Sequence, residues 1–395
     1  MAWYHATMFF AGSAKSYPRD SSFDVLIVGA GIMGTAAARE LAEAGMRVGV
    51  IESNSVGSGI TAAGMGHLVV MDDSPAQLAL TVFSRSLWQR DVRSFPASVE
   101  FAGRGTIWVA ADEEEMAGIS ARKRTFAAAG VASQVLNARA LAESEPNLRP
   151  GLAGGLLVPG DAVVNPPAGA EFYLQKARDG GAILIHSRAV SASQGEVRLD
   201  SGETLRAPRI VLATGVDCSL MPALPIQKRK GHLAITEPAP GFLHHQLVEL
   251  GYLKSAHQLH EDSVAFNVQP RGGGQIVIGS SRQYGNDDPR VDQEVLDNMR
   301  SRANAYMPEL AGLETARVWT GFRAATPDHL PLIGPAAPAL GPDCDTSLWL
   351  AAGFEGLGTT SAPGAAALLA DAMLGRESQI DRNPYLPARL LKEKA

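Results

Sequence analysis

Short apolar runs, glycine clusters and an alanine-rich stretch follow one another near the start of the chain. Residues 25–28 form a continuous apolar run, which is typical of a strand buried on both faces of a parallel sheet. Residues 35–44 are rich in Ala, Leu, Arg and Glu and predict a helix, with Gly45 at its end. Residues 47–51 predict a second strand with Glu52 at its tip. The pattern therefore predicts a strand, a helix and a strand in direct succession.

The rest of the chain changes from helical to alternating patterns several times. Helices are expected at 116–129 and 167–178, a strand at 182–186, and a hairpin at 195–215 that runs into an apolar strand. The stretch FAGRGTIWVAADEEEM is expected to form a pair of strands followed by a charged, solvated helix start, not a metal site. KRKGHLAITEP and GGGQIVIGSSRQYG alternate in character as antiparallel strands do. The C-terminal part predicts a strand, a glycine turn and a helix with Pro363 in its first turn and Gly375 at its end.

These elements predict an α/β protein, with a Rossmann-type dinucleotide-binding domain and a second domain built on a largely antiparallel sheet. No internal repeat or low-complexity tract is visible, and Pro and Gly are scattered along the chain. The two domains are therefore expected to interleave.

Composition excludes several classes of protein. The 395 residues carry a net charge of −6 without a basic block, which argues against a nucleic-acid partner. Cys218 and Cys344 form neither a disulfide framework nor a CxxC pair, as expected of thiols in a reducing compartment. Residues 1–22 are interpreted as a loose extension, and no run reaches the roughly 18 apolar residues of a spanning helix. We expect a cytoplasmic protein that does not span a membrane, with oligomerisation or partner subunits left open.

The glycines after the first strand have the spacing of a dinucleotide-binding turn. Gly29 allows the tight turn, Gly31 lets the backbone approach a pyrophosphate, and Gly34 lets the helix pack on the strand. Glu52 lies 21 residues after Gly31 (52 − 31), where a carboxylate accepts hydrogen bonds from ribose hydroxyls. Its charge disfavours a 2′-phosphate, so the cofactor is FAD or NAD.

The segment from Ser55 to Val69 favours FAD. NAD domains usually continue with another strand and helix, whereas this segment is small and rich in hydroxyls, and Ser58 and Thr61 suit a long, extended cofactor. A flexible surface loop is the alternative. The predicted strand that ends in Ala213, Thr214 and Gly215 lets a cofactor pass close to the backbone. The glycine turn before the last helix directs a helix N-terminus toward an electron-rich group.

The sequence resembles the D-amino-acid oxidase superfamily of FAD enzymes, which includes glycine oxidase, sarcosine oxidase and the FAD subunits of hydroxyproline dehydrogenases. Five elements occur in the family's order after about Phe23: VGAGIMGTAAA, GSGITAAGMG, RIVLATG, GFRAATPDHLPLIGP and GFEGLGTTSAPG. Within the family, TAAGMGHLVVMDD and GLGTTSAPG are most similar to bacterial D-hydroxyproline dehydrogenase catalytic subunits.

Two positions depart from the family. Gly321 stands where sarcosine oxidases attach flavin through a cysteine, which implies noncovalent FAD. Phe354 replaces a histidine that many relatives carry, which weakens any transfer of substrate or acceptor preference.

The resemblance implies oxidation of the CH–NH bond of a small D- or cyclic secondary amino acid, such as D-hydroxyproline or D-proline, by hydride transfer to flavin N5, which gives an imino acid. Oxygen, a quinone or an electron-acceptor protein would take the electrons. Arg323 is expected to bind the substrate carboxylate through its planar fork of donors. His67 is expected to face the flavin. The alternatives are a glycine- or sarcosine-oxidase-like enzyme in a biosynthetic pathway and a flavin-binding scaffold subunit.

The resemblance also implies a domain division: an FAD-binding domain from 23–90, 150–225 and 318–395, and a substrate domain from 91–149 and 226–317. Structural roles are expected for His232 and His329, while Tyr252 and Tyr284 are candidates to close over the substrate. The expected cofactor-binding residues are Gly29, Gly31, Ile32, Met33, Gly34, Glu52, Ser53, Ser58, Thr61, Ala62, Ala63, Gly64, Val190, Ala213, Thr214, Gly215, Gly353, Glu355, Gly356, Leu357, Gly358 and Thr359.

Overall fold

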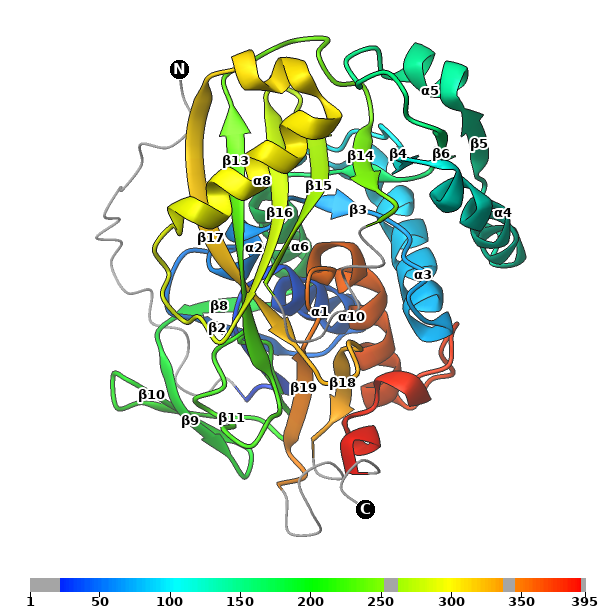
Figure 1. Ribbon diagram of the computed structural model, residues 1–395. Coiled ribbons are helices and arrows are strands. Elements are labelled where there is room, and N and C mark those ends of the chain that lie inside the picture. Colours follow the sequence, from blue (N-terminus) through cyan, green and yellow to red (C-terminus); the bar gives the residue numbers. More distant parts are fainter. Residues whose placement is uncertain (1–21, 252–261, 337–344, 392–395) are drawn as a thin grey trace.

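The computed structural model describes residues 22–251, 262–336 and 345–391 (Figure 1). Residues 1–21 of the expected extension lie outside the described residues, as do Tyr252 and Cys344. Within the described residues, no helix is long and apolar enough to cross a membrane.

The first sheet has six strands in the order β18-β19-β12-β1-β2-β8. All neighbouring pairs are parallel except the edge pair β18–β19. Helices cover one face of this sheet, and Val197, Leu199 and Leu205 pack on the other, so its central strands are apolar and buried up to Glu52 at the end of β2. The strands are β1 (Val25–Val28), β2 (Val48–Glu52), β8 (Ile183–His186), β12 (Ile210–Leu212), β18 (Leu332–Pro335) and β19 (Leu348–Ala352).

Helix α1 (Ile32–Glu43) packs between α6 (Pro166–Asp179) and α10 (Gly358–Leu374), and α10 packs in turn on α3 (Pro75–Asp91) (Figure 1). The alanine-rich middle of α1 is fully buried, because small side chains let three helices approach one another closely. The predicted strand–helix–strand order is confirmed. The helix begins at Ile32 rather than at residue 35, because the turn glycines already lead directly into its first turn.

The last helix begins earlier than predicted, so Pro363 lies inside α10 and not in its first turn. A proline there leaves the carbonyl group of Thr359 without its helical N–H donor. The indole Nε1 of Trp88 supplies a replacement and lies 3.1 Å from that carbonyl oxygen. Gly375 ends the helix in a left-handed conformation, as predicted.

The second sheet has eight strands in the order β17-β13-β16-β15-β14-β4-β6-β5, antiparallel except for the β14–β4 pair. The predicted antiparallel pairing of β13 with β16 is confirmed. The predicted strand pair around residues 101–110 is wrong: β4 is one strand, and Ala102 forms an isolated bridge with Val163. The strands are β4 (Thr106–Ala110), β5 (Gln134–Asn137), β6 (Gly154–Val158), β13 (Gln227–Thr236), β14 (Gln246–Glu249), β15 (Ser263–Pro270), β16 (Ile276–Tyr284) and β17 (Thr315–Ala325).

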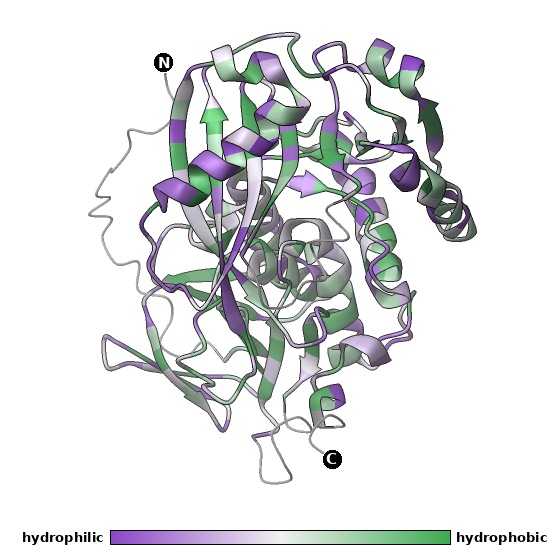
Figure 2. Ribbon diagram, in the orientation of Figure 1, coloured by the Kyte–Doolittle hydropathy of each residue, from purple (hydrophilic) through white to green (hydrophobic). Residues whose placement is uncertain are grey.

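Helix α8 (Gln293–Tyr306) covers one face of this sheet, and its mixed hydropathy in Figure 2 fits a helix with one buried side. Phe266, Val268 and Ile278 belong to the core that it covers, together with Leu296 and Met299 of α8. The opposite face of the sheet looks toward the first sheet. This face is where the candidate site forms.

Smaller elements complete the fold. Strands β9 (Ala189–Ser193), β10 (Glu196–Leu199) and β11 (Thr204–Arg206) form a separate sheet, and β3 (His67–Leu68) pairs with β7 (Ala162–Val163). The remaining helices are α2 (Ile60–Ala63), α4 (Glu113–Ala128) and α5 (Ala138–Ser144), and the short 3-10 turns are Val92–Ser94, Ala97–Val99, Pro308–Gly312, Asn383–Tyr385 and Pro387–Leu391.

The expected domain boundaries remain a prediction, but two of them cut through the eight-stranded sheet. Strand β6 and most of β17 fall in the ranges expected for FAD binding, yet both pair with strands of the eight-stranded sheet. Strand partners are fixed by contacts between distant segments, which the local pattern around residues 150 and 318 does not contain.

Candidate active site

A cavity of about 670 Å³ lies between the two sheets. One side is formed by the carboxyl ends of β1, β2 and β12, where ligands bind in open α/β sheets. The other side is formed by β13, β14, β15, β16 and β17 of the eight-stranded sheet. The cavity therefore joins a dinucleotide-type crevice to a second wall of different composition.

The glycine turn after β1 forms the floor of the crevice. Gly29 has φ +106°, and a Cβ atom there would lie 2.5 Å from the carbonyl oxygen of Ala213. A Cβ atom on Gly31 would lie 3.2 Å from the Thr61 hydroxyl. Gly34 does not line the cavity; a side chain there would collide with the backbone of Gly29. These glycines therefore allow the turn to pack closely on its neighbours, and Gly29 and Gly31 also line the cavity.

Glu52 lies at the end of β2 and lines the cavity. One carboxylate oxygen accepts a hydrogen bond from the backbone N–H of Ala30 (2.8 Å), and the other accepts one from Asn54 (2.7 Å). The two backbone donors fix the orientation of the carboxylate. Each oxygen retains a lone pair that can accept a further hydrogen bond from a ribose hydroxyl.

Helix α2 brings the hydroxyl-rich segment against the glycine turn. The Thr61 hydroxyl accepts a hydrogen bond from the backbone N–H of Ile32 (3.0 Å), which ties α2 to the start of α1. Ala62 is exposed and faces away from the cavity. Val190 is 44% exposed on β9 and does not line the cavity either, because the side chains of that edge strand alternate between solvent and the interior. Of the expected cofactor-binding residues, all line the cavity except Gly34, Ala62 and Val190.

The glycine turn between β19 and α10 is attached to the eight-stranded sheet by Glu355. Its backbone N–H donates to the carbonyl of Ala324 (2.8 Å), and its carboxylate forms an ion pair with Arg229 and a hydrogen bond with Nδ1 of His329 (2.7 Å). Burial raises the pKa of Glu355, but the hydrogen bond with His329 and the charge of Arg229 outweigh it and bring the pKa to about 2. The side chain of Glu355 is therefore engaged within the protein, while its backbone lines the cavity.

Arg323 extends from β17 across the neighbouring strand β13 into the cavity. Its Nη1 lies where a side chain on Gly231 would have to be, and it donates to the carbonyl of Ser281 on β16 (2.9 Å). Gly356 of the glycine turn packs against the same side chain: a Cβ atom there would lie 3.5 Å from its Nε. A planar, bidentate donor is therefore held where the two sides of the cavity meet.

His67 lies on β3, close to Arg323 and Gly356. Burial lowers the pKa of His67 to about 4, and the positive charges of Arg323 and Arg271 act in the same direction, against a backbone hydrogen bond with Gly356. The imidazole is therefore neutral at physiological pH. The structure brings together the two residues that the sequence predicted as catalytic.

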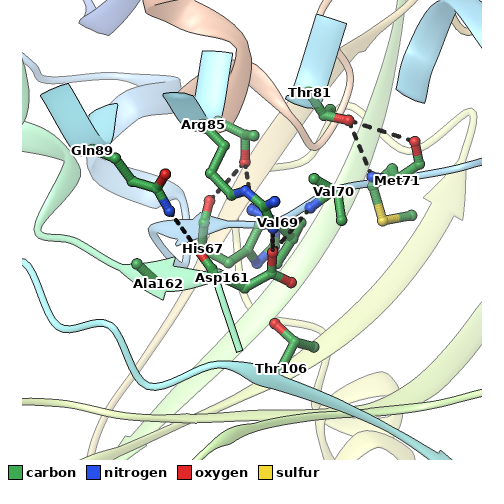
Figure 3. A network of polar contacts seen from close by, with 12 residues as sticks. His67, Val69, Val70, Met71, Thr81, Arg85, Gln89, Thr106, Asp161 and Ala162 are labelled. Atoms are coloured by element: carbon green, nitrogen blue, oxygen red, sulfur yellow. Dashed lines mark hydrogen bonds and ion pairs between the residues drawn. The ribbon is translucent and has the colours of Figure 1, made fainter. Parts of the chain in front are cut away.

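A buried polar network fixes the strand that carries His67. Thr360 donates to the carbonyl oxygen of His67 (2.8 Å), and Val70 donates to the carboxylate of Asp161 at 3.4 Å. Figure 3 shows the side chain of Arg85 reaching the same carboxylate, at 2.8 Å. Burial raises the pKa of Asp161 to about 6, against the charge of Arg85. This network attaches β3 to α3 and α10 and so limits the movement of His67.

The other candidate histidines have internal partners. His232 accepts from the backbone N–H of Asp292 (2.9 Å) and lies 3.0 Å from the hydroxyl of Ser281, which fits the expected structural role. His329 is paired with Glu355, as described above. Tyr284 contacts Arg229 and does not line the cavity.

Several residues that line the cavity were not predicted from the sequence. At the ribose side these are Asn54, Ser187, Arg188 and Ala189; on the sheet side they include Trp108, Gln246, Val248, Asn267, Ser280 and Arg282. Each is a single position in an ordinary strand or turn. Their placement depends on strand pairing over long separations, for example Gln246 opposite Thr106, and no local motif marks it.

A glycine-lined crevice with a ribose-type carboxylate, joined to a wall that carries an arginine, defines a dinucleotide-dependent enzyme with its substrate wall on a second sheet. The chain belongs to the family of FAD-dependent oxidoreductases, whose family model matches residues 24–372. It is 30% identical over 390 residues to the glycine oxidase of Pseudomonas aeruginosa, which covers 92% of this chain and 98% of that protein.

Two further relatives have related activities by name. The D-amino acid dehydrogenase of Vibrio cholerae serotype O1 is 25% identical over 324 residues, which covers 77% of this chain and 71% of that protein. The crystal structure of glycine oxidase from Geobacillus kaustophilus has a TM-score of 0.81 at 26% identity and covers 93% of this chain and 99% of its own. The protein is thus an FAD-dependent enzyme that oxidises amino acids or related amines, and the predicted family and fold class are confirmed.

Proposed function

We propose that the protein oxidises the CH–NH bond of a small D- or cyclic secondary amino acid, such as D-hydroxyproline or D-proline, to an imino acid. The observation that carries this proposal is the position of Arg323, which enters the cavity over Gly231 and beside Gly356. A guanidinium group binds a carboxylate through two parallel hydrogen bonds and so fixes its orientation as well as its charge. The likeness to a D-amino acid dehydrogenase supports a D-amino acid as substrate.

The crevice around Gly29, Gly31 and Gly215 fits FAD, because these glycines line it together with Thr61 and the Glu52 carboxylate, at the carboxyl ends of the strands. In this proposal Glu52 holds the ribose, and the N-terminus of α1 together with Thr61 faces the pyrophosphate. Bound flavin supplies the oxidising power, by accepting a hydride from the substrate. The protein supplies the position and the electrostatic environment of the amino acid.

Arg323 and His67 have complementary parts in this site. Arg323 neutralises the substrate carboxylate and orients the carbon that is oxidised. With a pKa of about 4, His67 is too weak a base to take a proton from an ammonium group at neutral pH. We assign to it a neutral hydrogen bond within the site, without a second positive charge beside Arg323.

The FAD is expected to be noncovalent. Gly321 lies on β17, and a side chain at this position would collide with the Cβ atom of Ala63. This packing leaves no room for the cysteine through which sarcosine oxidases attach flavin. Acid precipitation should therefore release the yellow colour into the supernatant, and colour that stays with the pellet would contradict this assignment.

A glycine- or sarcosine-oxidase-like activity is the second candidate, favoured by the likeness to the glycine oxidases of two bacteria. A scaffold subunit without catalysis is less well supported, because it does not need a carboxylate-binding arginine. Flavin absorbance separates these functions when the protein is mixed anaerobically with D-hydroxyproline, D-proline, D-alanine, sarcosine or glycine.

Bleaching by the D- or cyclic amino acids is the expected result, and preferential bleaching by glycine or sarcosine would favour the second candidate. Admission of oxygen after bleaching then separates an oxidase, which recovers its colour rapidly, from a dehydrogenase. Arg323→Ala should lower kcat/KM by roughly 30- to 1,000-fold with normal FAD content, and Arg323→Lys should recover part of it. Turnover by Arg323→Ala near the wild-type level would exclude the carboxylate role.

A further inference from the structure

The cavity face of the eight-stranded sheet carries a carboxamide side chain, Asn267, on β15. Phe266 and Val268 point to the core under α8, so Asn267 between them points to the opposite face. Asn267 pairs with Val248 on β14, and Val248 pairs with Trp108 on β4. All three line the cavity. Asn267 is thus a carboxamide in a row with Val248 and with Trp108, whose indole Nε1 has no hydrogen-bond partner among the described residues.

Asn267 is 7% exposed, and its Oδ1 has no hydrogen-bond partner among the residues that the structure describes. Buried side-chain amides in native proteins nearly always have partners, because an unmade hydrogen bond costs the full desolvation of the group. Asn267 also belongs to the lining of the cavity. An amide in this situation indicates a partner that arrives with the substrate.

A second carboxamide on the same face is oriented by the scaffold. The Nε2 of Gln246 lies 3.1 Å from the carbonyl oxygen of Ala162 and 3.2 Å from the hydroxyl of Thr106. A backbone carbonyl only accepts, so the atom that faces Ala162 must be the amide nitrogen. Both N–H groups of Gln246 are therefore used, and Oε1 is the polar atom that this side chain has left to offer the cavity that it lines.

Asn267 and the carbonyl group that binds Arg323 lie on neighbouring strands. Asn267 pairs with Gly279 on β16, and two residues further along that strand is Ser281, whose carbonyl accepts from Arg323. Ser281 is one strand away from Asn267 across the sheet and two residues away along the strand. These two displacements together place their backbones roughly 8 Å apart. A proline-sized molecule with its carboxylate on Arg323 can direct a substituent on the far side of its ring toward Asn267.

We propose that Asn267, assisted by Oε1 of Gln246, is a specificity-determining residue that recognises a hydroxyl group on the substrate, remote from its carboxylate. A carboxamide can both donate to a hydroxyl and accept from it, and the adjacent Val248 and Trp108 give no counter-charge for an ionised substituent. This assignment rests on the proposed function, and it selects hydroxylated amino acids such as hydroxyproline over their deoxy analogues.

The test compares matched substrates in variants of the FAD-loaded enzyme. Anaerobic flavin reduction is followed with cis-4-hydroxy-D-proline against D-proline, and with D-serine against D-alanine. The wild type should prefer the hydroxylated member of a pair by at least about tenfold, since a site built to bind a hydroxyl rejects the analogue without it. Asn267→Leu and Asn267→Ala should bring the ratio of the two kcat/KM values close to 1, mainly through loss of the hydroxylated substrate.

Val248→Ala is the matched control, because it changes the apolar neighbour of Asn267 on the same wall. It should lower both members of a pair by similar factors and leave their ratio unchanged. Binding of pyrrole-2-carboxylate, a carboxylate without a hydroxyl, is measured by its perturbation of the flavin spectrum. Its Kd should stay within about threefold of wild type in Asn267→Ala, which shows an intact carboxylate site.

Two results would overturn the assignment: no hydroxyl preference in the wild type, or an unchanged preference in both Asn267 variants with normal FAD content. These results differ from failure of the proposed function, in which none of the D- or cyclic amino acids bleaches the flavin.

Discussion

The guanidinium group of Arg323 occupies the space above Gly231 of the neighbouring strand. A Cβ atom on Gly231 would lie 2.6 Å from Nη1 and 3.1 Å from Cζ of Arg323. The two residues belong to paired strands, β13 and β17, and the arginine leans across the pair to reach Ser281 on β16. Glycine is therefore required at position 231, because any side chain there would displace the guanidinium group of Arg323.

The first prediction follows from this contact. Gly231→Ala should move the guanidinium away from its hydrogen bond with Ser281 and lower kcat/KM for the best amino-acid substrate by roughly 10- to 100-fold, since displacements of about 1 Å in a binding group have effects of this size. FAD content should stay normal, because the crevice is on the other sheet. Gly272→Ala is the control: it is an exposed loop glycine with nothing within 4 Å of its Cβ position. Equal kinetics for both variants would show that Arg323 does not need this space.

The dinucleotide half of the fold could be predicted because its signals are local. The turn glycines, the helix and Glu52 occur within one continuous segment, and each has a conformational reason that a short stretch of sequence displays. The carboxylate role proposed for Arg323 came instead from the resemblance of its flanking residues to a family. The structure adds the reason why Arg323 can reach the cavity, which its flanking residues do not show. Gly231 has no side chain and leaves space for the guanidinium group, on a strand nearly a hundred residues away in sequence.

The substrate wall could not be predicted in the same way. Asn267 is one polar position in an alternating strand, and the alternation does not reveal which face meets a cavity and which meets α8. The prediction for Val190 illustrates the limit: it is close in sequence to the lining residue Ala189, yet alternation along β9 turns it to solvent. Register between distant strands decides both cases.

The second prediction concerns the cofactor. Glu52→Ala should weaken FAD binding by roughly 10- to 150-fold, because a single hydrogen bond to a charged acceptor contributes about 1.5–3 kcal/mol. Glu52→Gln should have a smaller effect, since an amide oxygen still accepts from Ala30 or from a ribose hydroxyl. Titration of the apoprotein with FAD, followed by flavin fluorescence, gives the Kd. The control Glu171→Ala removes an exposed carboxylate from α6. An unchanged Kd for Glu52→Ala would show that this residue does not face the ribose.

The third prediction uses the low pKa of His67. Burial, with Arg323 nearby, lowers this pKa from 6.5 to about 4. Between pH 6.5 and pH 4 the unfolded chain holds a proton on this residue that the folded protein lacks, so the free energy of unfolding should fall as the pH falls through this range. The full effect is about 3 kcal/mol at most, and less where cavity water screens the ring.

His67→Gln should remove this part of the pH dependence. The measurement is the difference in unfolding free energy between wild type and variant from urea titrations at several pH values, because the subtraction cancels other titrating groups. Parallel curves for the two proteins between pH 4 and 6.5 would contradict the assignment. The pH profile of kcat/KM between pH 6 and 9 should show no limb that His67→Gln removes, since the imidazole stays neutral there.

The fourth prediction concerns the ion pair of Glu355 with Arg229, which attaches the glycine turn to the eight-stranded sheet. Arg229 is 2% exposed, so Glu355→Gln leaves a buried guanidinium without its carboxylate and should lower the free energy of unfolding by about 3–5 kcal/mol. Because the same turn lines the cavity, FAD affinity should fall as well. His329 should lose its raised pKa in this variant, because its hydrogen bond with Glu355 is the main cause of that rise.

Replacing Arg229 by Met in the same chain removes the unpaired charge. The double variant Arg229→Met/Glu355→Gln should therefore be more stable than Glu355→Gln alone, and unfolding by urea at saturating FAD measures this coupling. Strictly additive losses in the two single variants and the double variant would mean that Glu355 and Arg229 stabilise the turn independently, and the attachment of the turn would then rest on the backbone hydrogen bond between Glu355 and Ala324.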